Sequence, residues 1–186
     1  MTTPREQIIQ ATCFLLEKQG FPATGLNEIV RESGAPKGSL YHYFPEGKEQ
    51  LVSEAVLYSG EILVNRLRVE LDKDADPLQA IYTYILHLAD KIEEKQFSAG
   101  NPLSIVAIES AATSERISQA CRHVYSQLQA VFEEKLISSG MSSGQAEERA
   151  CSMMIGLEGG ILLSRVRRTT SPLRILAAHF RQEMNG

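Results

Sequence analysis

Apolar residues recur at intervals of three and four along nearly the whole chain, which is the spacing of one buried face of an α-helix. No stretch shows a sustained alternation of apolar and polar residues with β-branched enrichment, so no strand is expected. The pattern predicts an all-α fold of about nine helices. Their expected ranges are about 4–19, 25–33, 37–44, 48–71, 78–95, 103–112, 115–139, 144–167 and 172–184.

Helix starts are marked by capping residues as well as by periodicity. Thr3 and Glu6 form a capping-box pattern around Pro4, and Gly20 is placed to end the helix that follows. The expected core stripe of this helix is Ile8, Ala11, Thr12, Leu15 and Leu16. Later helix starts carry similar signals at Asp76-Pro77, Ser142 to Gln145 and Ser171-Pro172.

Residues 24–44 predict two short helices joined by a tight turn. The hydroxyl group of Thr24 can cap the first of them, and Gly34 can take the positive φ that closes it. The expected apolar face of this helix is Leu26, Ile29 and Val30. A short turn that contains glycine is typical of a DNA-binding helix-turn-helix.

The second helix of this pair displays hydrogen-bonding and aromatic groups. Its apolar anchors are Leu40 and Phe44. Such a helix lies in the major groove and reads base edges with its N-terminal residues. Lys37 can reach guanine or a phosphate, Ser39 can bond to several bases, and Gly38 lets the backbone approach DNA closely. A helical hairpin with a merely solvated face is the alternative, but three adjacent rings at residues 41–43 argue against it.

The run from Ala35 to Pro45, followed by Lys48-Glu49-Gln50-Leu51, resembles the signature of the tetracycline-repressor (TetR) family of bacterial transcriptional regulators. The likeness is specific over roughly residues 5–60. The resemblance implies DNA contacts by Lys37, Gly38, Ser39, Tyr41, His42 and Tyr43. It also implies phosphate contacts at Thr24 and at Lys48, which starts a helix whose N-terminus favours anions. The family pattern further implies a helix-turn-helix domain at 1–47 and a helical ligand-binding and dimerisation domain at 48–186.

The spacing after this signature departs from the commoner family pattern. Most members have one residue between Phe-Pro and Lys-Glu, whereas this chain has Glu46 and Gly47. The form Phe-Pro-x-Gly-Lys-Glu is similar to the branch that contains the LmrA and YxaF repressors of bacilli, some of which respond to flavonoids. The extra glycine can also shift Lys48 relative to the phosphate that it is expected to bind.

The charge balance is mildly acidic, with 19 Lys and Arg against 23 Asp and Glu and a formal net charge of −4. Through residue 48 the chain has five Lys or Arg and five Asp or Glu, so the predicted DNA-reading part is neutral. Non-specific attraction to phosphates should therefore be weak, and affinity should depend on a dimer and on specific contacts. The hydrophobic content of 43% is enough for a core.

The three cysteines, Cys13, Cys121 and Cys151, have spacings that form no metal motif and no disulfide framework. We expect reduced structural thiols, with redox sensing as the minor alternative, and we expect neither a metal nor a cofactor. No apolar run reaches the ~20 residues that span a bilayer, and no signal peptide is visible. A cytoplasmic protein without a membrane partner is expected.

Three glycines on one face of a predicted helix, Gly156, Gly159 and Gly160, each lower helix stability by about 1 kcal/mol relative to alanine. Their missing side chains let another helix approach closely. The family resemblance implies a twofold four-helix dimer interface here, which we favour over packing within the chain. The expected interface residues are Ile155, Gly156, Gly159, Gly160 and Leu163, with Leu162 beside them.

A ligand cavity is also implied by the resemblance. Methionine and aromatic side chains with a few polar groups suit an apolar ligand. The residues expected to line the cavity are Tyr84, His87, Leu88, Phe97, Asn101, Glu109, Gln127, Met154 and Glu158. Ordinary core or surface positions are the alternative for each of them.

Together these features predict a homodimeric repressor that binds a palindromic operator and is released by a small, largely apolar or aromatic effector. The alternatives are a transcriptional activator and a non-enzymatic helical protein that binds small molecules. An enzyme is not expected, because residues 140–144 match Gly-x-Ser-x-Gly without the strand that this motif requires. An architectural or membrane-associated protein would need a basic surface, which the neutral N-terminal part lacks.

Overall fold

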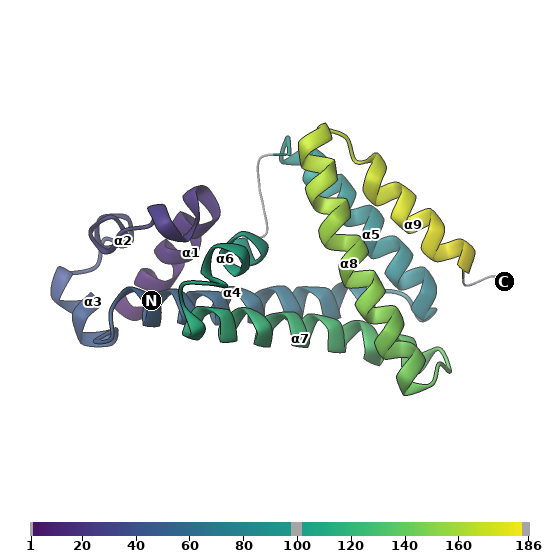
Figure 1. The fold of residues 1–186 in the computed structure, drawn as a ribbon, viewed down its shortest axis with the longest axis horizontal. Helices are drawn as coiled ribbons and strands as arrows, with labels where there is room; N and C mark the ends of the chain where they lie inside the picture. The colour runs from purple at the N-terminus through teal and green to yellow at the C-terminus, as the bar shows by residue number, and fades with distance from the viewer. Residues whose placement is uncertain (1, 98–101, 184–186) are drawn as a thin grey trace. The chain divides into compact units, whose positions relative to one another are not determined.

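The computed structural model describes residues 2–97 and 102–183, and within these ranges the chain forms nine helices and no strand. Their bounds are α1 Pro4–Ala23, α2 Leu26–Ser33, α3 Lys37–Tyr43, α4 Lys48–Leu71, α5 Pro77–Glu94, α6 Pro102–Ser110, α7 Glu115–Ser138, α8 Ser143–Arg167 and α9 Ser171–Glu183 (Figure 1). The predicted all-α fold is confirmed, and every predicted helix has a counterpart.

Capping residues explain where helices begin. The Thr3 hydroxyl accepts a hydrogen bond from the N–H of Glu6 at 3.2 Å, and the Glu6 carboxylate accepts one from the N–H of Thr3 at 2.8 Å. The predicted capping box of α1 is therefore present. Asp76 caps α5, since its carboxylate accepts a hydrogen bond from the N–H of Leu78 at 3.0 Å.

The end of α1 differs from the prediction. Gly20 ends the regular helix with φ 76° and ψ −178°, and one further turn continues to Ala23. The hydroxyl group of Thr24 donates to the carbonyl of Gly20 at 2.6 Å, while the N-cap position of α2 is Gly25, which makes no side-chain cap bond. The predicted capping of α2 by Thr24 is therefore wrong, because the break at Gly20 leaves a nearer acceptor for that hydroxyl.

Packing divides the chain into two units, neither of which is one continuous segment. Unit 1 comprises residues 1–63 and 101–125, and unit 2 comprises residues 64–100 and 126–186. Helices α4 and α7 each begin in unit 1 and end in unit 2. This division describes packing, and the functional boundary between residues 47 and 48 stays a prediction.

The core of unit 1 is built on α1, which packs against α2, α3 and α6 (Figure 1). All members of its predicted core stripe are buried, and Ile9 beside them is buried as well. Helices α4 and α7 also lie close together in this unit. A Cβ atom on Gly60 of α4 would stand only 2.3 Å from Cγ2 of Val124 in α7. Glycine is therefore the residue that allows this close approach.

In unit 2, α9 packs against α5 and α8 (Figure 1). A Cβ atom on Gly156 would stand 2.6 Å from Leu176 Cδ1, and one on Gly160 would stand 2.7 Å from Leu173 Cδ2. Gly156 and Gly160 therefore serve packing within the chain, which was the alternative to the dimer interface, because α9 occupies the space beside them. Around Gly159, no described atom outside the neighbouring backbone of α8 comes within 4 Å of an added Cβ. Of the three, only Gly159 leaves that space open to a partner.

Candidate nucleic-acid interface

Helices α2 and α3 are joined by the turn Gly34-Ala35-Pro36. Gly34 takes the left-handed conformation with φ 64° and ψ 4°, so its predicted role in closing α2 is confirmed. Ile29 of α2 and Leu40 of α3 are both 0% exposed and anchor the two helices in the core. The short glycine-containing turn and the buried anchors are typical of a helix-turn-helix.

The outer face of α3 carries the residues that the family resemblance assigns to DNA. Lys37, Gly38, Tyr41 and His42 are exposed, and Ser39 and Tyr43 are half-buried. Tyr41 is 52% exposed, so much of its ring is open to an outside partner. The rings of His42 and Tyr43 meet edge to face with centroids 5.0 Å apart. This face offers a cation, hydroxyl groups and aromatic rings, which suit contacts with phosphates and base edges.

No packing contact among the described residues requires a glycine at position 38. Apart from the neighbouring backbone of α3, no described atom lies within 4 Å of a Cβ added there, and the φ of Gly38 is not positive. A glycine within a helix costs about 1 kcal/mol relative to alanine. The missing side chain therefore leaves room for an outside surface to approach the backbone of α3.

The two residues implied to bind phosphate are engaged within the chain. Lys48 Nζ donates to the carbonyl oxygen of Phe21 at 2.7 Å and lies 4.4 Å from the centroid of its ring. Burial lowers the pKa of Lys48, and the charge of Glu109 opposes this shift. Thr24 is 0% exposed. The main-chain N–H of Lys48 lies in the first turn of α4, where amide groups lack intrahelical partners and can bind an anion.

The extra residue before α4 forms a turn that reaches another helix. Gly47 has φ 80°, in the left-handed region that favours glycine. The carboxylate of Glu46 pairs with the guanidinium group of Arg116 in α7. The main-chain N–H of Glu46 donates a hydrogen bond to Gln50 Oε1 at 3.0 Å. In this chain the segment with the departing spacing thus contacts the start of α7.

The predicted ligand residues are spread over both units. The Tyr84 ring packs edge to face on Phe132 with centroids 6.0 Å apart, and burial raises the pKa of Tyr84 to about 12. His87 is exposed, with Nδ1 3.4 Å from Glu70 Oε2. Glu109 lies in unit 1, where its carboxylate accepts a hydrogen bond from the N–H of Phe21 at 2.7 Å. Local spacing could not reveal this last contact, because its residues are 88 positions apart.

The other predicted ligand residues lie mostly at half-buried positions. Leu88, Phe97, Met154 and Glu158 are half-buried, Gln127 is exposed, and Asn101 lies outside the described residues. That the predicted residues together surround one ligand stays a prediction.

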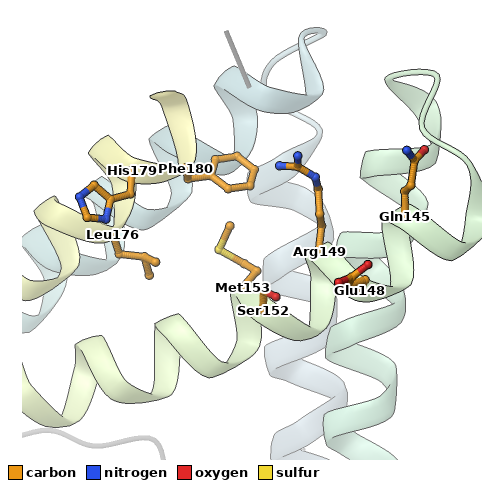
Figure 2. A pocket seen from close by; sticks show the side chains of 8 residues that line it. All are labelled: Gln145, Glu148, Arg149, Ser152, Met153, Leu176, His179 and Phe180. Carbon is orange, nitrogen blue, oxygen red and sulfur yellow. The ribbon is translucent and has the colours of Figure 1, made fainter. Parts of the chain in front are cut away.

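A groove of about 530 Å³ lies between α8 and α9 in unit 2 (Figure 2). Leu176, His179 and Phe180 of α9 line it, together with Gln145, Glu148, Arg149, Ser152 and Met153 of α8. None of the predicted ligand residues lines this groove. Its α8 residues recur with helical spacing and are mostly polar, so the sequence indicates an ordinary solvated helix face there.

The three cysteines are free. Cys13 is half-buried, Cys121 is buried and Cys151 is exposed, and burial raises the pKa of the first two to about 11. Over residues 2–97 and 102–183, no three or more His, Cys, Asp or Glu side chains gather as a metal site would require. In the same ranges, no helix combines the length and the apolar character needed to cross a membrane.

Known proteins resemble the chain over nearly its whole length. Residues 8–55 match the model of the bacterial regulatory proteins of the tetR family, and residues 77–179 match that of the LmrA/YxaF-like transcriptional regulator C-terminal domain. The HTH-type transcriptional regulator YxaF of Bacillus subtilis is 39% identical, over 93% of this chain and 91% of that protein. The HTH-type transcriptional regulator LmrA of the same bacterium is 38% identical, over 91% of this chain and 90% of that protein.

Solved structures show the same fold. The reduced form of E. coli NemR superposes with a TM-score of 0.84 at 22% identity, over 97% of this chain and 96% of that chain. A TetR transcriptional regulator from Legionella pneumophila superposes with a TM-score of 0.82 at 14% identity, over 98% of each chain. At these identities the likeness supports the all-α architecture alone.

Proposed function

Because this chain belongs to the TetR family of transcriptional regulators and carries an LmrA/YxaF-like C-terminal domain, we propose that it is a ligand-responsive repressor that binds a palindromic operator as a homodimer. The observation that carries the DNA-binding part is the outer face of α3. That face combines exposed Lys37, Tyr41 and His42 with an unfilled space at Gly38. We place the protein in the cytoplasm, where its operator lies.

The proposed DNA contact uses α3 in the major groove. Two copies of α3, about 34–36 Å apart, would enter successive grooves of a palindromic site. Lys37 and Ser39 reach base edges or phosphates, and Tyr41, His42 and Tyr43 contact phosphate, sugar or the thymine methyl group. For Lys48, the proposed phosphate ligand is the main-chain N–H, since the ammonium group is bonded to Phe21.

The proposed dimer interface lies on α8. Ile155, Leu162 and Val166 are apolar yet 69%, 62% and 73% exposed, and Leu163 beside them is 42% exposed. Before Gly159, α8 carries three Glu and one Arg, and after Gly159 it carries two Arg and no acidic residue. Two copies of α8 that cross antiparallel at Gly159 therefore set an acidic half against a basic half. Such charge complementarity supports a second copy of this chain as the partner.

The proposed effector is a small, largely apolar molecule that binds among the helices after residue 47. To empty the operator it must favour the non-binding state by about 3–5 kcal/mol. The proposed lining residues remain those predicted from the sequence. Two of them already have polar partners within the chain, since His87 faces Glu70 and Glu109 bonds to Phe21.

A gel-shift assay on DNA upstream of the protein's own gene tests the DNA-binding proposal. Tyr41→Ala and His42→Ala should abolish the specific shift, and Lys37→Ala should weaken it, because each removes a group from the outer face of α3. Lys18→Ala is the matched control, since Lys18 is an exposed lysine on α1. Wild-type affinity in the Tyr41→Ala protein would refute the recognition-helix assignment. Release of the shift by one compound from a panel of flavonoids and hydrophobic drugs would identify the effector class.

Sedimentation tests the proposed interface. Gly159→Asp should convert the dimer to a monomer, because a charge at the crossing point would be buried without a partner. Gly144→Asp is the matched control, since Gly144 lies on the same helix and also has no described atom within 4 Å of an added Cβ. An unchanged mass for Gly159→Asp would remove Gly159 from the interface.

A further inference from the structure

Phe21, at the end of α1, is bound on both sides by charged side chains from two other helices. Its N–H donates to Glu109 Oε2 of α6 at 2.7 Å. Its carbonyl oxygen accepts from Lys48 Nζ of α4 at 2.7 Å, and the same ammonium group lies 4.4 Å from the centroid of the Phe21 ring. Charge-assisted hydrogen bonds of this length are among the strong ones in proteins. The end of α1 is thus tied to α4 and to α6.

Gly20 explains why these bonds form at this point. Its φ of 76° and ψ of −178° interrupt α1, so the N–H of Phe21 needs a partner from outside the regular helix. A Cβ atom on Gly20 would stand 2.7 and 2.8 Å from the two carboxylate oxygens of Glu109. Glycine at this position therefore serves two needs, namely the positive φ and the space for the carboxylate.

Further polar contacts join the same parts of unit 1. The hydroxyl group of Ser114, just before α7, donates to Glu49 Oε2 of α4 at 2.6 Å. Arg116 of α7 pairs with Glu46 just before α4, but the two side chains are 40% and 67% exposed, and ion pairs open to solvent in this way contribute little. The segment from Glu109 to Arg116 therefore contacts both the end of α1 and the start of α4. The helices α2 and α3 lie between these two points in the sequence.

We propose that Glu109 and Lys48 are positioning residues for operator binding, which act through Phe21 to fix the orientation of α2 and α3. This inference rests on the proposed repressor function. Helix α1 ends at Ala23, two residues after Phe21, and α2 begins after Gly25. A displaced Phe21 therefore changes the direction in which α2 and α3 leave α1. The carboxylate of Glu109 serves this contact, which gives it a role other than lining a ligand cavity.

Operator affinity measured by fluorescence anisotropy at several salt concentrations tests the proposal. Glu109→Ala should weaken binding about tenfold, as expected for the loss of one charge-assisted hydrogen bond. Glu109→Gln should retain most of the affinity, because its amide oxygen can accept the same N–H. Glu61→Ala is the matched control, since Glu61 is an exposed glutamate on α4. Wild-type affinity in Glu109→Ala would overturn the proposal.

Lys48→Met separates positioning from phosphate binding. A positioning role lowers affinity at every salt concentration and leaves the salt dependence unchanged, whereas a lost phosphate contact reduces the salt slope by about 1 per site. Because Glu109 and Lys48 act on the same residue, the double variant should lose less affinity than the product of the single losses. The proposal that Glu109 and Lys48 both act through Phe21 would be overturned by a reduced salt dependence in Lys48→Met. It would also be overturned if the affinity loss of the double variant equalled the product of the two single losses.

Amide hydrogen exchange in the free protein gives a reading that does not depend on an operator. Exchange in α2 and α3 should be faster in Glu109→Ala than in Glu61→Ala, because the helices lose a fixed attachment. Equal exchange rates would overturn the proposal. If the wild-type protein itself binds no upstream DNA specifically, the repressor function fails, and the exchange rates still decide whether Glu109 positions these helices.

Discussion

Replacement of Gly60 by alanine should destabilise the protein, although alanine is the better helix former. The helix propensity alone would stabilise α4 by about 1 kcal/mol. Against this gain, the new Cβ would stand 2.3 Å from Val124 Cγ2 and 2.7 Å from Cγ1. Carbon atoms pack at about 3.5–4.0 Å, so Val124 would have to move by more than about 1 Å.

Val124 has little freedom to make this movement. Its side chain is 1% exposed, and a β-branched residue in a helix has one strongly preferred rotamer. Overpacking of a well-packed core costs about 1–3 kcal/mol, and the short contact points to the upper end of that range. The net loss should therefore be about 1–2 kcal/mol, which corresponds to a fall in Tm of about 2–8 °C for a chain of this size.

Urea unfolding followed by circular dichroism measures the effect. All variants should be compared at one protein concentration, because the stability of the proposed dimer would depend on concentration. Val124→Ala alone should cost about 1.5–3 kcal/mol through lost burial. In the Gly60→Ala, Val124→Ala double variant, the two losses should partly cancel, by about 1 kcal/mol or more. A Gly60→Ala protein as stable as wild type, or strictly additive losses, would refute the argument that glycine sets this helix approach.

Other predictions follow from single positions. Gly38→Ala should stabilise the protein by about 0.5–1 kcal/mol in thermal unfolding, because its Cβ meets no described atom, and should weaken the operator gel shift, because that Cβ would face DNA. A hydrogen bond from Lys73 lowers the pKa of Glu70, so Glu70→Gln should be less stable than wild type near neutral pH. That difference should begin to fall near pH 4.5, where the unfolded carboxyl protonates, and should be lost once the pH is below the lowered pKa of the folded state; a difference that persists in urea titrations at still lower pH would contradict this. With a thiol reagent at about pH 8, Cys151 should react rapidly, and Cys13 and Cys121 only after unfolding, because burial raises the pKa of these two to about 11. Rapid reaction of all three thiols in the folded protein would show that Cys13 and Cys121 are accessible to the reagent.

Helix positions could be predicted because their signals are local. The capping box at Thr3, the Asp76 cap and the closing Gly34 each depend on residues within about four positions of one another. The helix-turn-helix was predictable for the same reason, since its turn and its two buried anchors lie within a short segment. The family signature then assigned DNA as the expected partner of the outer face of α3, which spacing alone does not do.

Contacts between distant segments could not be predicted in this way. The hydroxyl of Thr24 suits a helix cap, but a kink four residues earlier offers it a closer acceptor. The charge of Lys48 suits a phosphate, but the carbonyl of Phe21 lies within its reach. Gly156 and Gly160 allow a close helix approach, and only the structure shows that the approaching helix is α9 of the same chain. In each case the local chemistry was identified, and the partner was determined by tertiary packing.

The division of α4 and α7 between the two units has a consequence for synthesis and for engineering. Unit 1 includes residues 101–125, so the ribosome must release these residues before the N-terminal helices can complete their packing. A fragment that ends at residue 63 would lack α6 and would leave apolar surface of α1 exposed to water. A chimera that transfers the whole of unit 1 must therefore exchange two separate stretches of the gene.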